Sequence, residues 1–145
     1  MIASDYITIV MIEDDEGHAR LIEKNLRRAG ITNELIHFSD GRKALEYFFP
    51  ENNAVPPRPM LILLDLNLPE IDGFTILSHL KTNPSTQDIP IIILTTTENA
   101  EEIQCCYEMG CNVYIVKPVD YDNFAESIRK LGLLLAIVKI PGEAL

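Results

Sequence analysis

The sequence predicts an α/β fold built on a parallel sheet, and two patterns carry that prediction. Five short runs are continuously apolar and rich in β-branched residues, which suits strands that are buried on both faces. These runs span residues 7–12, 35–38, 60–64, 91–94 and 113–116. Segments with apolar residues at helical spacing alternate with the runs, so we expect right-handed crossover connections between parallel strands.

The helical segments follow the strands in order. In the first, apolar residues recur at spacings of three and four: Ala19, Ile22, Leu26 and Ala29. Gly30 comes next and is a typical helix stop. The same periodicity predicts further helices around residues 44–48, 74–80 and 124–131. The segment 99–109 is less clear by periodicity but ends at Gly110, and residues 50–59, with four of the nine prolines, are expected to form a stiff surface loop.

Length and composition limit the classes of protein to consider. The 145 residues, 47% hydrophobic and 23% charged, suit one globular domain. The net charge of −10 would be repelled by phosphate backbones and anionic lipid, so we expect neither a nucleic acid nor a membrane as partner. The first ten residues do not resemble a signal peptide, and the longest nearly apolar run, residues 131–138, is too short to span a bilayer. The three cysteines lack disulfide or zinc-site spacing, so the chain is predicted to be cytoplasmic.

Polar side chains follow four of the five predicted strands, at the sheet edge where open parallel sheets bind ligands. They are Glu13, Asp14 and Asp15 after the first strand, Asp65 after the third, Thr95 after the fourth and Lys117 after the fifth. Carboxylates held close together repel one another unless a cation joins them, and Mg²⁺ takes one or two carboxylates with waters and a phosphate oxygen. Lys117 and Thr95 offer a positive charge and a hydrogen-bond donor to a phosphoryl group. Because no Ser or Cys competes with it, Asp65 is the natural nucleophile.

Each of these residues also has a simpler interpretation. An acid between a strand and a helix is often only an N-cap, and Asp15 is open to that interpretation. A lone Asp at a strand end is usually a turn residue, and a lone Lys-Pro pair usually has no special role. The coincidence of such groups at four strand ends favours a shared site for phosphoryl chemistry.

Three other classes of protein fit the residues less well. A hydrolase of the haloacid dehalogenase type needs a second acid two residues after its nucleophile, where Asn67 stands. A nucleotide or flavin site needs a glycine-rich loop after the first strand, where acids stand instead. A binding module with a decayed site would not be expected to keep the acids, the hydroxyl and the ammonium together.

Four segments resemble the receiver domain of bacterial two-component response regulators. They are Ile12-Glu13-Asp14-Asp15, Leu63-Leu64-Asp65-Leu66-Asn67-Leu68-Pro69 with Asp72-Gly73, Leu94-Thr95, and Tyr114-Ile115-Val116-Lys117-Pro118. The resemblance runs from about residue 7 to residue 131 and implies a flavodoxin-like (βα)5 doubly wound parallel sheet with strand order 2-1-3-4-5. Residues 1–131 would form the receiver domain, and residues 132–145 an apolar C-terminal extension.

The resemblance implies roles for the acids and their neighbour. Asp65 would be the phosphoacceptor and a metal ligand, and Asp14 would bind Mg²⁺ directly. Glu13 would hold the metal through water, and the backbone carbonyl of Asn67 would be a further ligand. Glu13 stands where the family often has Asp, and Asp15 adds a third acid. The metal pair could therefore be shifted by one residue, although the end of the apolar strand favours Glu13 and Asp14.

The resemblance also implies a phosphoryl contact and a conformational switch. Thr95 would bind the phosphoryl group in the activated state, and Lys117 would contact it by charge. As Thr95 moves, Tyr114 would turn inward, so these two residues would form the switch. The Lys117–Pro118 peptide bond is expected to be cis, and Gly73 to stand where the backbone needs a positive φ.

The implied function is that of a single-domain response regulator, which is a phosphoacceptor and not an enzyme. A sensor histidine kinase would donate the phosphoryl group to Asp65 in a Mg²⁺-dependent reaction, and the changed conformation would relay the signal. Thr96 stands where the family usually has a smaller residue. Its branched side chain is expected to hinder the entry of water, which bears on the lifetime of the phosphorylated state.

The C-terminal segment has more apolar residues than one helix face can bury. The excess must meet another surface, either the chain's own domain or a second copy of the chain. We favour a homodimer formed through an arm over residues Gly132–Ile140. This segment is similar to the tails of stand-alone receivers that serve phytochrome-type histidine kinases, so the resemblance implies a bacteriophytochrome as a candidate kinase.

Overall fold

The computed structural model describes residues 7–52, 60–117 and 121–135. Within them, strands and helices alternate in chain order: β1 (Thr8–Ile12), α1 (Glu16–Arg28), β2 (Leu35–Phe38), α2 (Gly41–Phe48), β3 (Met60–Leu64), α3 (Gly73–Thr82), β4 (Ile91–Thr95), α4 (Ala100–Met109), β5 (Val113–Val116) and α5 (Tyr121–Leu135). The strands form one parallel sheet in the order β2-β1-β3-β4-β5. The predicted flavodoxin-like α/β fold and its strand order are confirmed.

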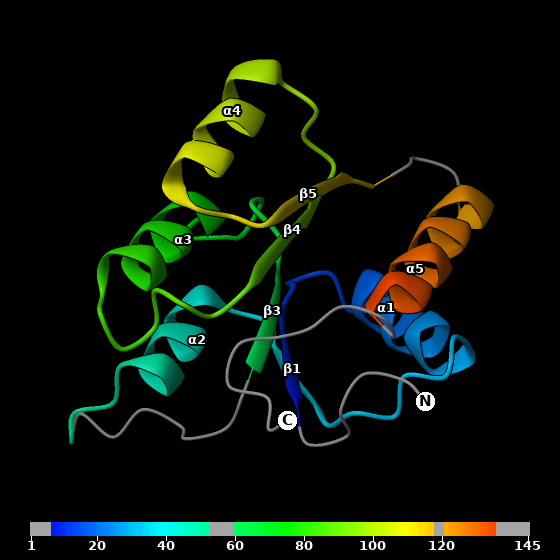
Figure 1. Ribbon diagram of the computed structural model, residues 1–145, viewed down its shortest axis with the longest axis horizontal. Helices are drawn as coiled ribbons and strands as arrows, with labels where there is room; N and C mark the ends of the chain where they lie inside the picture. The colour runs from blue at the N-terminus through cyan, green and yellow to red at the C-terminus, as the bar shows by residue number, and fades with distance from the viewer. Residues whose placement is uncertain (1–6, 53–59, 118–120, 136–145) are drawn as a thin grey trace.

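Helices cover both faces of this sheet. Figure 1 shows α1 and α5 side by side on one face and α2, α3 and α4 on the other. Side chains alternate across each strand, so in β1 Ile9 and Met11 belong to the apolar core under α1 and α5, whereas Val10 and Ile12 belong to the core on the opposite face. An apolar run without polar alternation therefore fills two cores at once, as its pattern predicts.

Polar side chains begin four of the helices. In each case an Asp or Asn accepts a hydrogen bond from a backbone N–H of the first turn, which caps the helix: Asp15 for α1, Asp40 for α2, Asp72 for α3 and Asn99 for α4. At its other end α4 stops at Gly110, whose φ of 108° lies in the left-handed region. The caps thus define α4, for which the apolar periodicity was weak.

The backbone of Gly73 does not have the positive φ that its sequence context predicted. Among the described glycines only Gly30 and Gly110 have positive φ. The reason for glycine is space: a Cβ at position 73 would lie 2.4 Å from the carbonyl oxygen of Asp65 and 2.5 Å from the Cα of Leu66. The prediction of a positive φ was wrong because the residue is required by the close approach of α3 to the end of β3.

Other predictions fall on residues that the structure does not describe. The Lys117–Pro118 peptide bond and much of the proline-rich loop lie outside the described residues. Helix α5 continues through Gly132 to Leu135, and the remainder of the predicted arm lies outside them as well. Among the described helices, none is both long enough and apolar enough to cross a membrane.

Candidate functional site

Residues predicted at the strand ends lie together at the carboxyl edge of the sheet. We call this group the acidic cup, and its members are Glu13, Asp14, Asp65, Thr95 and Lys117. Sheet hydrogen bonds extend one residue beyond two strands and place their side chains. The backbone N–H of Asp65 donates to the carbonyl of Ile12 at 3.0 Å, and the N–H of Lys117 donates to the carbonyl of Thr95 at 2.6 Å.

Three carboxyl groups of the acidic cup face one another. Oxygens of Glu13, Asp14 and Asp65 all lie within 4.8 Å of each other. Glu13 and Asp65 are buried, with 2% and 6% of their surface exposed, whereas Asp14 is exposed. Asp15 is oriented differently, because its carboxylate accepts the backbone N–H of His18 at 2.9 Å and caps α1. The group of three carboxyls therefore contains Glu13 and not Asp15.

The ammonium of Lys117 lies between the buried acids. Lys117 is 3% exposed, and its Nζ donates to Oε1 of Glu13 and, at 3.1 Å, to Oδ2 of Asp65. Nδ1 of His18 lies 3.2 Å from the same Nζ. A buried charge is costly unless it is paired and hydrogen-bonded, and these contacts provide that pairing.

The two buried acids have opposite pKa shifts. Burial and a hydrogen bond with Asp65 raise the pKa of Glu13 to about 8, against the attraction of Lys117. Burial also opposes ionisation of Asp65, but the hydrogen bonds from Glu13 and from the backbone N–H of Asn67 outweigh it and lower its pKa. The charge of Lys117 acts in the same direction. Near neutral pH Asp65 is therefore the ionised member of the pair, which is the state that a carboxylate nucleophile needs.

Asn67 links the end of β3, beside Asp65, to the end of β4. Its backbone N–H donates to Oδ1 of Asp65 at 3.0 Å. Its side-chain amide donates to Oγ1 of Thr95 at 3.1 Å and to Oγ1 of Thr96 at 3.0 Å. Thr95 is fully buried, with its hydroxyl held beside the carboxylate of Asp65. Nothing in the sequence indicates this contact between Asn67 and Thr96.

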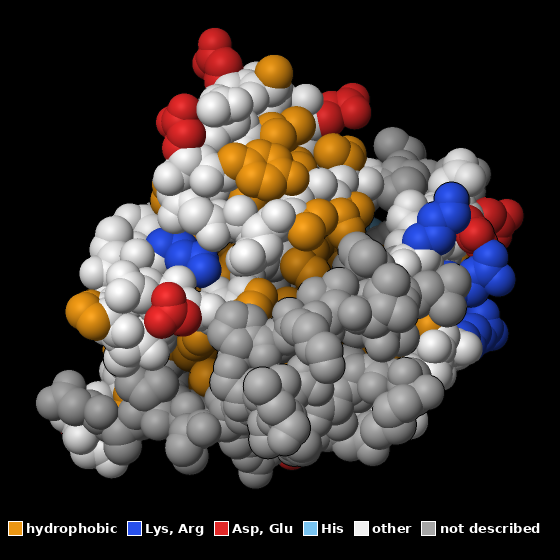
Figure 2. All heavy atoms as spheres, viewed as in Figure 1, with side chains coloured by type: hydrophobic (Ala, Val, Ile, Leu, Met, Phe, Trp, Pro, Cys, Tyr) orange, Lys and Arg blue, Asp and Glu red, His pale blue; other side chains and the backbone are white. Residues whose placement is uncertain are grey.

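Tyr114 on β5 points toward the connection between β4 and α4. Its hydroxyl donates to the carbonyl of Thr97 at 2.7 Å, and burial raises the pKa of this hydroxyl to about 12. The backbone N–H of Tyr114 donates to the hydroxyl of Tyr107 on α4 at 3.1 Å. Tyr107 is 46% exposed, and Figure 2 shows hydrophobic side chains gathered over α4 and β5.

Sequence reasoning assigned no role to the histidines, yet two of them contact the acidic cup. Besides approaching Lys117, His18 lies 3.9 Å from a carboxylate oxygen of Glu13. His37 on β2 donates from Nε2 to the carbonyl oxygen of Glu13 at 2.7 Å. One available signal was position: His18 lies in the first turn of the helix that follows β1, close to the edge where the acids were predicted.

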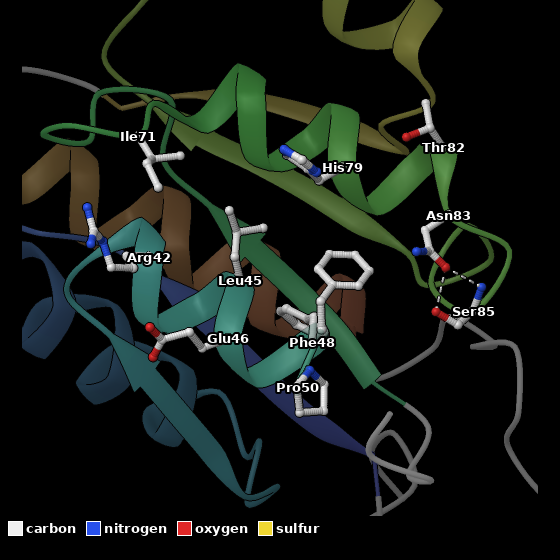
Figure 3. A pocket seen from close by; sticks show the side chains of 11 residues that line it. Arg42, Leu45, Glu46, Phe48, Pro50, Ile71, His79, Thr82, Asn83 and Ser85 are labelled. Carbon is white, nitrogen blue, oxygen red and sulfur yellow. Dashed lines mark hydrogen bonds between the residues drawn. The ribbon is translucent and has the colours of Figure 1, made fainter. Parts of the chain in front are cut away.

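A hollow elsewhere on the molecule is separate from the acidic cup. It measures about 650 Å³ and lies between α2 and α3, where Leu45, Phe48 and Ile71 form apolar walls (Figure 3). His79, the third histidine, is also among its lining residues. The residues that line this hollow are distinct from those of the acidic cup.

The sequence matches one family over most of its length. The family model for the response regulator receiver domain matches residues 9–129. Rcp1 of Synechocystis sp. is 38% identical over 135 residues, which cover 92% of each chain. The Mn²⁺-bound form of Rcp1 superposes with a TM-score of 0.83 at 32% identity, covering 92% of this chain and 98% of that chain.

Two further solved structures are similar over nearly the whole chain. A response regulator receiver domain from Rhodospirillum rubrum is 55% identical and superposes with a TM-score of 0.89, covering 93% of this chain and 97% of that chain. The phosphorylated cyanobacterial phytochrome response regulator RcpA is 30% identical, with a TM-score of 0.81 and coverage of 92% and 97%.

Proposed function

The chain belongs to the response regulator receiver family, and from this premise we propose that Asp65 accepts a phosphoryl group from a sensor histidine kinase. Receiver domains are phosphoacceptor signalling modules and not catalytic enzymes. The observation that carries the proposal is the state of Asp65, which is buried, held ionised and 3.1 Å from the Lys117 ammonium.

The donor set of the acidic cup suits a hard divalent cation. Mg²⁺ prefers carboxylate and carbonyl oxygens, and three carboxyl groups within 4.8 Å of one another supply them. Glu13, Asp14 and Asp65 would hold the ion, with the backbone carbonyl of Asn67 as a further ligand. When bound, Mg²⁺ would neutralise charge on the phosphoryl oxygens. The Mn²⁺-bound form of Rcp1 supports a divalent cation in this family.

Asp65, Lys117 and Thr95 would each have a separate role in phosphoryl transfer. An oxygen of Asp65 would attack phosphorus in line as the bond to the imidazole nitrogen of the kinase's phosphohistidine breaks, and the imidazole would leave with a proton. Lys117 would donate to a phosphoryl oxygen, since its Nζ already donates to Asp65. The hydroxyl of Thr95 accepts a hydrogen bond from Asn67 and can donate its own hydrogen to the phosphoryl group.

The signal would leave the site through Thr95 and Tyr114. Movement of Thr95 toward a phosphoryl group would pull on the segment that includes Thr97, whose carbonyl accepts the Tyr114 hydroxyl. Tyr114 would then change its position beside α4, where its backbone also contacts Tyr107. Such a local change would bias two arrangements of the surface over α4, β5 and α5.

Labelling with acetyl phosphate and Mg²⁺ tests the acceptor. Wild type is expected to be labelled, and Asp65→Asn is expected to lose the label. Asp15→Asn is the matched control, because it makes the same chemical change nearby and Asn still caps a helix. Label retained by Asp65→Asn, or lost by Asp15→Asn alone, would contradict the assignment.

We also propose a phytochrome-type histidine kinase as donor and a homodimer formed through residues Gly132–Ile140. The similarity to RcpA and Rcp1 over more than nine-tenths of the chain supports the first. The apolar composition of that segment supports the second. A phytochrome kinase that carries a labelled phosphohistidine should transfer the label to wild type faster than an unrelated histidine kinase does. Equal transfer rates from the two kinases would reject the pathway.

A further inference from the structure

The contact between His18 and Lys117 joins the first turn of α1 to the end of β5. Nδ1 of His18 lies 3.2 Å from the Lys117 ammonium, and the two residues are 99 positions apart in sequence. A lysine ammonium has donors and no acceptor. A hydrogen bond in this contact therefore runs from the ammonium to Nδ1 of the imidazole, which acts as the acceptor.

Among the described residues, Glu13, Asp65 and His18 each place an acceptor beside the ammonium, and the reaction requires different things of them. Glu13 and Asp65 are both proposed metal ligands, and Asp65 is also the group that becomes phosphorylated. Their interactions with Lys117 must change when a cation and a phosphoryl group enter. Of these three residues, His18 is neither a proposed metal ligand nor the proposed phosphoacceptor. It can therefore keep its contact with Lys117 throughout the reaction.

Holding the ammonium matters because lysine is a point charge on a flexible four-carbon stem. A charge that is already aimed at the place where the phosphoryl oxygens will lie costs no reorganisation during transfer. Lys117 is 3% exposed and lies 3.1 Å from Asp65, so it is already near that place. An acceptor on a second element restrains the ammonium from the α1 side.

We propose that His18 is a positioning residue for phosphoryl transfer, whose imidazole holds the Lys117 ammonium beside Asp65. This inference rests on the proposed function of Asp65 as acceptor. An ordinary structural role has to be distinguished from it, because His18 also lies in the capped first turn of α1, with its Nδ1 3.8 Å from Oδ2 of Asp15. A structural role predicts a loss of stability, whereas a positioning role predicts a loss of rate.

Two substitutions of nearly equal shape separate these roles. In His18→Asn the side-chain oxygen stands at the same distance along the side chain as Nδ1 and can accept, whereas His18→Leu removes the acceptor. The rate constant for phosphorylation by acetyl phosphate in Mg²⁺ is expected to fall about tenfold in His18→Leu, as for loss of one hydrogen bond to a charged group. In His18→Asn it should stay close to wild type. Thermal unfolding of both variants reports any change in stability.

Rescue by the asparagine variant decides the inference. A slow leucine variant beside a fast asparagine variant supports it, and His18→Ala provides a second removal variant if the leucine variant is unstable. Unchanged rates in all variants, or equal losses with leucine and asparagine, would overturn it while wild-type labelling still supports Asp65 as acceptor. If wild type takes no label and Asp65→Asn behaves identically, the proposed function fails and the role of His18 fails with it.

Discussion

Replacing Gly73 by alanine should destabilise the protein and disturb Asp65, the proposed phosphoacceptor. The new Cβ would lie 2.4 Å from the carbonyl oxygen and 3.0 Å from the carbonyl carbon of Asp65, and 2.5 Å from the Cα of Leu66. Carbon atoms pack at about 3.5–4.0 Å, so the overlap with the Leu66 Cα is roughly 1 Å. All three atoms belong to the backbone, and no flexible side chain can turn away. The start of α3 or the end of β3 has to shift.

The size of the effect follows from two opposing contributions. Overpacking against a rigid neighbour costs about 3 kcal/mol, while replacing a helical glycine by alanine returns about 1 kcal/mol. A net loss of about 2 kcal/mol should lower Tm by roughly 4–8 °C in a chain of this size. Because the displaced backbone belongs to Asp65, the phosphorylation rate should fall as well.

Urea and thermal unfolding measure the loss of stability, and labelling by acetyl phosphate measures the loss of rate. Gly17→Ala is the matched control in α1, where the nearest atom to a new Cβ is a side-chain oxygen of Asp15 at 3.2 Å. That variant should lose much less stability than Gly73→Ala, because the one close atom belongs to a side chain and not to the backbone. If Gly73→Ala unfolds at the same urea concentration as Gly17→Ala, the steric explanation for Gly73 is wrong.

Three further predictions concern pH, oligomerisation and lifetime. In the metal-free protein, the pKa of Glu13 is raised from 4.5 to about 8, so its contribution to stability is fully present below 4.5 and is lost as the pH rises through 8. Thermal unfolding in EDTA should therefore show a steeper fall in Tm between pH 5 and 8 for wild type than for Glu13→Gln, and parallel curves would contradict this. Removal of residues 133–145, which takes away most of the proposed arm Gly132–Ile140, should convert a dimer to a monomer in light scattering; an unchanged mass would reject the arm. Thr96→Ala removes a hydroxyl that accepts from Asn67 and should shorten the lifetime of the aspartyl phosphate, measured as loss of label over time; a longer lifetime would refute the shielding role of Thr96.

Much of the fold could be predicted from the sequence because each strand carries its own signal. Apolar runs without alternation indicate burial on both faces, and Ile9 and Val10 do lie in different cores. Helix α4 was harder, since Cys106 is its one buried residue and so little apolar periodicity can exist. Asn99 and Gly110 marked its ends better than its interior did. A helix that buries little is therefore found from its caps.

The candidate site could likewise be predicted from the sequence only in part. The edge rule for parallel sheets places Asp65, Thr95 and Lys117 together without knowledge of any side-chain direction. The contacts of His18 and His37 depend on how α1 and β2 sit against that edge, which no spacing in the sequence encodes. Gly73 illustrates the same limit for the backbone. Its sequence context indicates that glycine is needed, but whether for φ or for space depends on how closely two elements approach.

The sequence indicates which charged groups meet in the acidic cup, but not which of the carboxyl groups are ionised. Several carboxylates near one ammonium predict repulsion, and two structural features relieve it. Asp15 turns to cap α1, and burial raises the pKa of Glu13 to about 8 so that it keeps a proton below that pH. What remains near neutral pH is an ionised Asp65 paired with Lys117 at 3.1 Å. Counting acidic residues along the chain overstates the repulsion between them. Burial keeps Glu13 protonated below pH 8, and the carboxylate of Asp15 is directed toward the first turn of α1.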